Sequence, residues 1–270
     1  MLYDDQPISQ DEEDKLNRTP FVDEIVELIN RYTEYDEKKD NHAGLVIGLE
    51  GAWGSGKTSI LNLLENKFQE RKEKYVVQRL DSWLALDCTA LAAEFFKMLG
   101  IAAVDTGAFL GKTHIQGIPK VISGFAKSIT LSIPTPAGSI GFDFEKFLHS
   151  DTLREEKEKI RKKLFKSQKY IIYMIDDIDR LNSKEIAFVM QLVKNIADFS
   201  KIIYILSYDR EIVTEALQRI DGKNGRDFME KIIQVPIQMP EFGKADLLQY
   251  FRGELRTIIQ SESISDGFTI

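Results

Sequence analysis

The segment from Gly51 to Thr58 limits the folds open to this chain more than any other. It reads Gly-Ala-Trp-Gly-Ser-Gly-Lys-Thr, which matches the spacing G-x-x-x-x-G-K-[ST]. An apolar run over residues 45–49 precedes the segment, and a helix-like stretch from Ser59 to Gln69 follows it. A strand, a glycine-rich loop and a helix in this order predict a phosphate-binding loop, or P-loop, in an α/β domain.

The residue types of the loop suit a polyphosphate ligand. Glycines adopt backbone angles that are closed to other residues and let phosphate oxygens approach the chain, while the free N–H groups at the start of the helix point at the anion. Lys57 would place its charge on the β- and γ-phosphates, and the Thr58 hydroxyl suits Mg²⁺. The alternative is a glycine-rich turn with an exposed lysine. The predicted nucleotide-binding residues of this segment are Gly51, Ala52, Trp53, Gly54, Ser55, Gly56, Lys57, Thr58 and Ser59.

Length, composition and charge narrow the class of protein. The 270 residues suffice for one large α/β domain, or one domain and part of a second, and the 43% hydrophobic content supports a core. The net charge of −7 argues against a surface devoted to nucleic acid. The single cysteine, Cys88, rules out an internal disulfide and fits a cytoplasmic location, and we expect it to be a small buried residue rather than a nucleophile.

The remaining features of the sequence argue against a histidine metal site, a signal peptide and a membrane span. The three histidines are scattered and lack metal-ligand spacing. The polar, acidic N-terminus argues against a signal peptide, and no apolar run reaches the roughly 18 residues that span a bilayer. We therefore expect no transmembrane segment.

A second motif follows the apolar run over residues 170–175. The run ends in Asp176 and Asp177, and carboxylates at the carboxyl end of a central parallel strand lie where α/β proteins bind ligands. Asp176 would hold Mg²⁺, usually through water, and Asp177 would orient or deprotonate the attacking water. An acidic turn that caps a helix is the alternative, but the P-loop about 120 residues upstream favours a Walker B motif.

Another apolar run, over residues 201–206, ends in Ser207, and Asp209 follows closely. A polar residue at this place can sit beside the γ-phosphate as a sensor, and Ser207 is the first candidate. Asp209 is the second, with capping of the next helix as its alternative role. Arg180 and Arg210 could contact phosphate across a subunit interface, or each could form a local salt bridge.

The chain divides into five parts. Residues 1–41 read as an N-terminal arm and helix, and residues 42–99 as the P-loop half of the domain. Glycines and prolines interrupt residues 100–143, which we interpret as an insertion: a small subdomain, a partner surface or a weak membrane-contacting element. Residues 144–240 form the half with Walker B and the sensor. Residues 241–270 begin a C-terminal helical region that ends like a linker, so we expect a truncated chain.

Periodicity places the other elements. Two strand–helix units in a row predict a parallel sheet. The charged stretch over 157–169 is the one basic track that could touch nucleic acid, although such runs are usually solvated helix faces. Strands are expected over residues 45–49, 75–80, 170–175, 201–206 and 232–236, and helices over residues 20–35, 59–69, 89–99, 144–168, 183–199, 210–229 and 244–260.

In these motifs and their order the chain resembles the KAP family of P-loop NTPases, a branch of the additional-strand class near the STAND and AAA+ groups. The resemblance covers about residues 5–240. The segments that carry it are Asp14-Lys15-Leu16-Asn17-Arg18-Thr19-Pro20-Phe21, the P-loop with Trp53, Asp81-Ser82-Trp83, Asp176-Asp177-Ile178-Asp179-Arg180, Ser207-Tyr208-Asp209-Arg210 and Glu230-Lys231-Ile232-Ile233-Gln234-Val235-Pro236.

The resemblance implies a three-layer α/β fold with a five-stranded, mainly parallel sheet in the order 5-1-4-3-2. It implies that the arm lies near the nucleotide base, which makes Asn17 and Arg18 candidate contacts. It also implies ATP as the nucleotide, since no guanine-reading motif is evident. Many members carry transmembrane helices between the two Walker motifs, whereas residues 100–142 are too polar to span a membrane. The soluble bacterial members, some from phage-defence neighbourhoods, fit this chain best.

These expectations combine in a Mg²⁺-dependent ATPase that acts as a switch or motor. Its catalytic residues would be Lys57, Asp177 and Ser207, and its metal ligands Thr58 and Asp176. Proteins that contact residues 100–143 or the C-terminal region, and a second copy of the chain, are the expected macromolecular partners. Three alternatives stay open: a nucleotide-gated binding module without hydrolysis, a nucleic-acid-associated ATPase, and a small-molecule kinase, for which the sequence shows no acceptor signature.

Overall fold

A computed structural model of the chain describes the arm, most of both predicted half-domains and short pieces of the remainder. The described residues are 6–39, 44–82, 87–107, 122–124, 126, 151–196, 199–221, 225–241, 243, 248, 250–253 and 255–256. The predicted insertion over 100–143 and the predicted C-terminal helix over 244–260 therefore lie largely outside the described residues, as does Trp83.

Five strands form one sheet, and each pairing between them is parallel in the part of the chain that the structure describes. The order is β2-β3-β4-β1-β5, which is the expected order 5-1-4-3-2 read from the other edge. The predicted α/β fold is thereby confirmed. The strands are β1 (Leu45–Glu50), β2 (Tyr75–Asp81), β3 (Tyr170–Asp176), β4 (Ile202–Tyr208) and β5 (Val235–Gln238).

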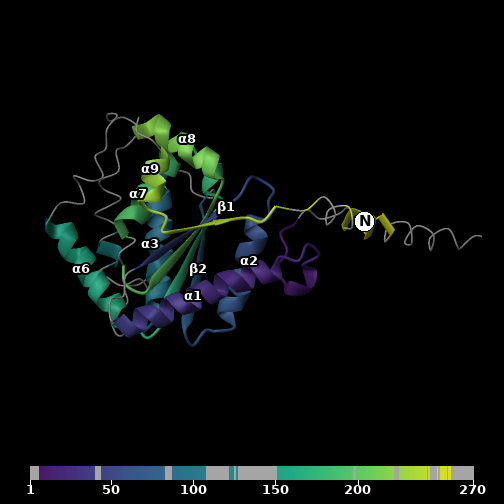
Figure 1. The fold of residues 1–270 in the computed structure, drawn as a ribbon. Helices are drawn as coiled ribbons and strands as arrows, with labels where there is room; N and C mark the ends of the chain where they lie inside the picture. Colours follow the sequence, from purple (N-terminus) through teal and green to yellow (C-terminus); the bar gives the residue numbers. More distant parts are fainter. Residues whose placement is uncertain are drawn as a thin grey trace, which may run out of the picture.

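Helices cover both faces of the sheet, so the molecule has three layers (Figure 1). One layer holds α1 and α2, and the other holds α3, α6, α7 and α8. The helical elements are η1 (Asp11–Glu13), α1 (Thr19–Lys39), α2 (Lys57–Gln69), α3 (Cys88–Asp105), α6 (Asp151–Phe165), η3 (Ile178–Arg180), α7 (Ser183–Ile196), α8 (Arg210–Asp221) and α9 (Gly225–Glu230).

The central strands are apolar because both of their faces are covered. Every residue of β1, β3 and β4 is buried. Along β3 the side chains alternate: Tyr173 packs in the core beneath α3 and α7, and its neighbours Ile172 and Met174 pack beneath α1 and α2. Because β1, β3 and β4 run parallel, their carboxyl ends lie at one edge of the sheet. The polar residues of the motifs lie at this edge.

Several predicted boundaries were wrong, and two of them concern segments that contribute to the core. The helix expected to end at Leu99 continues through Gly100 to Asp105, because the small residues Ala102 and Ala103 are fully buried and keep the helix packed. The last strand begins at Val235 rather than at Ile232. Ile232 instead follows α9, donating its N–H to the carbonyl of Met229, and its side chain lies in the core.

The N-terminal arm is docked along α2 in its described residues. Asn62 Nδ2 donates to the carbonyl of Ile8 (2.9 Å), and Lys67 pairs with Asp11 (2.8 Å). At the start of α1, Asp14 accepts hydrogen bonds from both the N–H (2.7 Å) and the hydroxyl (2.8 Å) of Thr19. The contacts of Asn62 and Lys67 fix the arm to α2, and those of Asp14 fix it to the start of α1.

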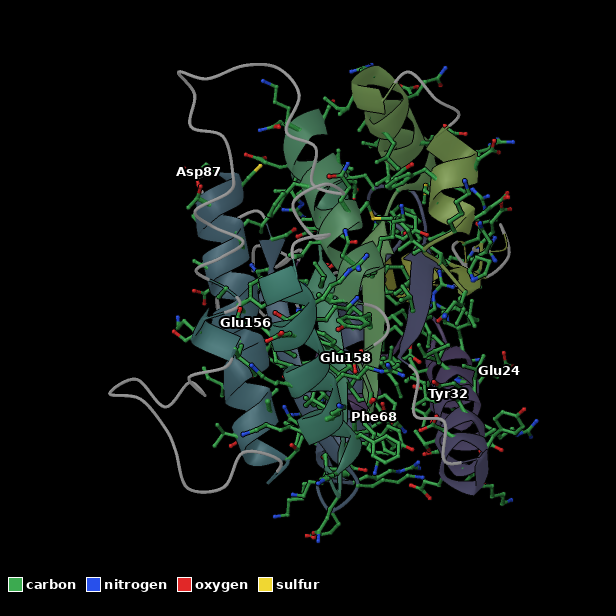
Figure 2. All side chains as sticks on the ribbon, turned by 90° about the vertical axis from the view of Figure 1, so that its left-hand side faces the viewer. Glu24, Tyr32, Phe68, Asp87, Glu156 and Glu158 are labelled. Atoms are coloured by element: carbon green, nitrogen blue, oxygen red, sulfur yellow. The ribbon has the colours of Figure 1, made fainter. Side chains whose placement is uncertain are left out.

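The predicted charged helix is α6, which lies on the outer side of the layer that contains α3 (Figure 2). Ile160 and Leu164 face the core, whereas most other described side chains of α6 are exposed, as expected of a solvated helix face. On its exposed face Glu155 pairs with Lys159 (3.8 Å), and Glu158 pairs with Arg161 (3.2 Å). Of the helices that the structure describes, none has the length and apolar character needed to cross a membrane.

Candidate nucleotide-binding site

The P-loop joins β1 to α2 at the carboxyl edge of the sheet. Gly51 N–H donates to the carbonyl of Tyr208 (3.1 Å), which ties the start of the loop to the end of β4. Gly54 (φ 78°) and Gly56 (φ 89°) lie in the left-handed region, and a Cβ at either position would meet nothing within 4 Å. The loop therefore needs glycine at these two positions and presents its backbone to open space, as an anion-binding loop requires.

Lys57 is the first residue of α2 and is 6% exposed. Its ammonium group donates to the carbonyls of Gly51 (2.8 Å) and Ala52 (3.3 Å) and lies 3.7 Å from Oδ2 of Asp179. Asp179 belongs to η3, directly after β3, and its other oxygen, Oδ1, has no hydrogen-bond partner among the described residues. The P-loop lysine thus joins the two motifs that the sequence separates.

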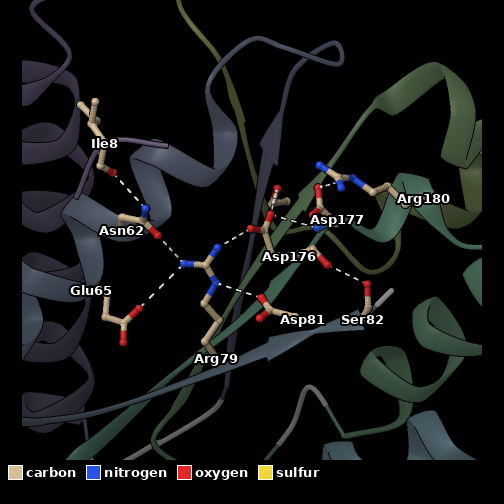
Figure 3. A network of polar contacts seen from close by, with 10 residues as sticks. Ile8, Asn62, Glu65, Arg79, Asp81, Ser82, Asp176, Asp177 and Arg180 are labelled. Carbon is tan, nitrogen blue, oxygen red and sulfur yellow. Dashed lines mark hydrogen bonds and ion pairs between the residues drawn. The ribbon is translucent and has the colours of Figure 1, made fainter. Parts of the chain in front are cut away.

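Asp176 ends β3 and is 1% exposed. Oδ1 accepts hydrogen bonds from the Ser207 hydroxyl (2.7 Å) and the Asp177 N–H (2.9 Å), and Oδ2 accepts one from Arg79 Nη2 (Figure 3). Ser82, at the end of β2, donates its hydroxyl to the Asp176 carbonyl (2.6 Å). Strands β2 and β4 therefore fix the orientation of this carboxylate from both sides.

Asp177 adopts a left-handed backbone conformation, φ 56°, which aspartate tolerates better than most residues. Its Oδ1 lies 3.0 Å from Arg180 Nε. Burial, and secondarily the charge of Asp176, raises the pKa of the Asp177 carboxyl, and Arg180 opposes that rise. A carboxylate with a raised pKa is better suited to accept a proton near neutral pH than an ordinary aspartate.

The predicted metal ligands, Thr58 and Asp176, offer oxygen donors of the kind that Mg²⁺ prefers. The described residues contain no group of three or more His, Cys, Asp or Glu side chains arranged to hold a metal. A site that adds nucleotide phosphate oxygens to one hydroxyl and one carboxylate does not need such a group. Ser55 Oγ is buried without a hydrogen-bond partner among the described residues, which fits a ligand on the loop. The residues present therefore fit Mg²⁺ bound together with a nucleotide.

The other predicted nucleotide contacts differ in exposure. Trp53 lies at the loop with 78% of its surface exposed. Asn17 is exposed, with φ 55°, whereas Arg18 is buried and donates from Nη1 to the carbonyl of Pro240 (2.7 Å), beyond the end of β5. The structure thus gives Arg18 a role in holding α1 to the sheet edge. Contact of Asn17 and Arg18 with the base stays a prediction.

The side chains after β3 and β4 make local contacts. Ser207 is fully buried against Asp176, so its contact with the γ-phosphate stays a prediction. Asp209 accepts from the N–H of Glu211 (2.9 Å) and so caps α8, which was its alternative role. Arg180 pairs with Asp177, and Arg210 pairs with Glu50 (3.1 Å), as in the alternative of local salt bridges.

Cys88, at the start of α3, is partly buried and packs against the core. Burial raises the pKa of its thiol to about 11, with a further rise from Glu185 and Asp87. The thiol is therefore protonated at neutral pH, as expected of a structural cysteine.

Sequence reasoning missed two charged residues of this region. Arg79 lies on β2 and bonds the Walker B carboxylate. Glu50, at the end of β1, is 2% exposed and accepts hydrogen bonds from Tyr208 Oη (2.9 Å), Arg210 Nη1 (3.1 Å) and Gln238 Nε2. Arg79 interrupts and Glu50 ends a strand that is otherwise largely apolar. A charged residue at such a place in a strand was the signal that could have identified them.

With this geometry in place, comparison with known proteins decides the family. The family model described as the KAP family P-loop domain matches residues 18–268. The chain belongs to the KAP family. Over 248 residues this KAP-family chain is 29% identical to the phage T7 exclusion protein of Escherichia coli (strain K12), and the match covers 81% of the chain. The match covers 33% of the relative, so the chain spans about a third of that protein's length.

Solved structures similar to this KAP-family chain include the ORC2 protein of Aeropyrum pernix in its ADPNP-ADP complexes. That structure has a TM-score of 0.42 and 11% identity, with 87% of this chain and 51% of that chain covered. The Walker-type ATPase of Pyrococcus abyssi has a TM-score of 0.43 and 12% identity, with 96% of this chain and 63% of that chain covered.

Proposed function

We propose that the chain binds ATP with Mg²⁺ and hydrolyses it, acting as a nucleotide-driven switch or motor. The main support for the proposal is that the P-loop and the predicted Walker B segment lie in contact. Lys57 of the P-loop lies 3.7 Å from Asp179, and the Walker B carboxylates Asp176 and Asp177 stand in the same short segment. Membership of a family of P-loop NTPases supports the same reading.

In the proposed reaction each residue has a separate task. The loop amides and Lys57 bind the β- and γ-phosphates and balance the charge of the transferring phosphoryl group. Thr58 and Asp176 would hold Mg²⁺, which supplies further charge neutralisation when bound. Asp177 orients the attacking water and accepts its proton, a task that its raised pKa suits. Ser207 keeps Asp176 in place through its hydrogen bond to Oδ1.

The direct test is phosphate release from ATP, with and without Mg²⁺, by the wild-type chain and by Lys57→Ala. A matched control is Lys97→Ala, which removes an exposed lysine paired with Glu94 on α3. The proposal predicts Mg²⁺-dependent release by the wild-type and control chains and at least a hundredfold loss in Lys57→Ala. Nucleotide binding that depends on Lys57 without any release would instead support a nucleotide-gated binding module.

The role in the cell is a separate proposal, supported by the E. coli relative, which is described as a phage T7 exclusion protein. We propose that nucleotide turnover by this chain serves the exclusion of phage. The test compares phage plaque numbers on cells that express the wild-type protein, Lys57→Ala or Lys97→Ala. Protection by the wild-type and Lys97→Ala proteins but not by Lys57→Ala would support the proposal. Equal protection by all three would contradict it.

A further inference from the structure

Arg79 lies at the centre of the polar network beside the Walker B carboxylate (Figure 3). Its side chain is 18% exposed. Nη1 donates to Asn62 Oδ1 on α2 (2.6 Å), and Nη2 donates to Asp176 Oδ2. Nε lies 3.3 Å from Oδ1 of Asp81, and Glu65 stands 3.9 Å from Nη1. Three carboxylates therefore surround this one guanidinium group.

The sheet register explains why two of these carboxylates stand close to each other. Asp81 and Asp176 are partners in the parallel pairing of β2 with β3, and they are the last residues of their strands. Arg79 precedes Asp81 by two residues, so its side chain points to the same face of β2. The guanidinium thus sits between the buried Asp176 and the more exposed Asp81, whose side chain is 45% exposed.

The contact with Asp176 has a consequence for cation binding. Oδ2 of Asp176 is the oxygen not bonded to Ser207 or to the Asp177 N–H, and Arg79 holds it. A divalent cation and a guanidinium group at one carboxylate oxygen repel each other strongly when both are partly buried. The Arg79 guanidinium and a divalent cation would therefore compete for this oxygen.

We propose that Arg79 is a positioning residue that competes with the divalent cation for Oδ2 of Asp176 and shifts to Asp81 when the cation binds. Nε already lies 3.3 Å from Asp81, and Asn62 holds Nη1, so a small rotation transfers the charge from one carboxylate to the other. Arg79 thereby sets how tightly the metal–nucleotide complex is held. This inference rests on the proposed function, because it needs a cation bound with nucleotide at the P-loop.

The test measures Mn²⁺ affinity in the presence of saturating ADP by electron paramagnetic resonance, which needs no turnover. The chains are the wild-type, Arg79→Gln, and the control Arg161→Gln, which removes an arginine paired with Glu158 on α6. Removing the competing charge predicts about tenfold tighter Mn²⁺ binding in Arg79→Gln and no change in the control. Equal or weaker Mn²⁺ binding in Arg79→Gln overturns the inference, since a purely structural role would not tighten the site.

A second variant tests the shift to Asp81. Asp81→Asn removes the second carboxylate, so Arg79 stays on Asp176 and Mn²⁺ binding should weaken about threefold. In Arg79→Gln the same substitution should have little effect, because its influence passes through the guanidinium. Equal weakening in both backgrounds would mean that Asp81 acts only by its own charge, which contradicts the proposed shift.

If Arg79→Gln does not fold, Arg79→Lys carries the same test. Lysine keeps the charge but lacks the planar fork that bonds Asn62 and Asp176 together, so a weaker hold on Asp176 predicts about threefold tighter Mn²⁺ binding. Unchanged or weaker binding overturns the inference. A wild-type chain that binds no Mn²⁺ with ADP overturns the proposed function as well, whereas normal wild-type binding with unaltered variants overturns only the role of Arg79.

Discussion

Lys57 Nζ lies 3.7 Å from Oδ2 of Asp179, and this contact joins the P-loop to the turn that follows the Walker B strand. Both side chains are almost fully buried, at 7% and 3% exposure. The ammonium group also bonds the carbonyls of Gly51 and Ala52, so one charged group organises the loop and the acidic turn together. The stability of the site and its proposed chemistry are therefore linked through Lys57.

Replacing Lys57 by methionine should destabilise the fold by about 3 kcal/mol, because Asp179 then stays buried without a counter-charge. Urea unfolding measures the change. In the double variant Lys57→Met/Asp179→Asn the buried charge is absent, so at least half of the lost stability should return. Wild-type stability in the single variant would show that the ion pair does not matter to the fold.

The raised pKa of Asp177 predicts a pH-dependent effect on stability. Because the folded-state pKa lies above the unfolded value, the folded chain binds this proton more tightly, and stability is lost as the pH rises through the folded pKa. Asp177→Asn removes the titration, and asparagine also tolerates the left-handed backbone. The variant should therefore gain stability relative to wild-type as the pH rises from about 4 towards neutrality. A stability difference that is constant over that range would contradict the raised pKa.

Arg180 should affect the pH at which the rate of phosphate release falls on the acid side. Its charge lowers the pKa of Asp177, against the larger upward effect of burial. Arg180→Ala removes that charge and should move the acid limb of the rate–pH profile to higher pH, whereas Arg180→Lys should leave it close to the wild-type position. A profile of steady-state phosphate release between about pH 5 and pH 8 makes the comparison. An unmoved limb in Arg180→Ala would indicate that Asp177 is not the titrating base.

The order of the sheet was predicted from the resemblance to the KAP family, whereas the placement of the motifs was predictable because it depends on local signals. A P-loop, two apolar strands and the polar residues that end them each occupy a few consecutive residues, and parallel strands bring their carboxyl ends to one edge. The pair Asp176 and Ser207 is an example. Each was predicted at the end of its strand, and the structure places them in hydrogen-bond contact at 2.7 Å.

Contacts set by pairing register were not predictable in the same way. Arg79 and Asp176 are 97 residues apart, and they meet because Asp81 and Asp176 are in register at the ends of β2 and β3. No local pattern specifies that register. The predicted end of the helix at Leu99 was wrong for a different reason. Gly100 suggested a break, but it is buried in α3, where tertiary packing outweighs the low helix propensity of glycine.

Glu50 should contribute to stability through the donors that surround it. Glu50→Ala leaves the Arg210 guanidinium and the Tyr208 hydroxyl without their acceptor near the end of β1. The loss should be about 3 kcal/mol in urea unfolding. Glu215→Ala is the matched control, because its exposed pair with Arg219 on α8 should contribute less than about 0.5 kcal/mol. Equal effects of the two substitutions would contradict the structural role of Glu50.

The measurement that tests the account most directly compares ATP binding and ATP hydrolysis in the wild-type chain and Asp177→Asn. Fluorescent-nucleotide titration gives the affinity, and single-turnover phosphate release gives the rate. The account predicts ATP affinity within about threefold of wild-type and at least a hundredfold slower release, since Asp177 acts on the water rather than on the nucleotide. Phosphate release at the wild-type rate by Asp177→Asn would contradict the assignment of Asp177 as the catalytic carboxylate.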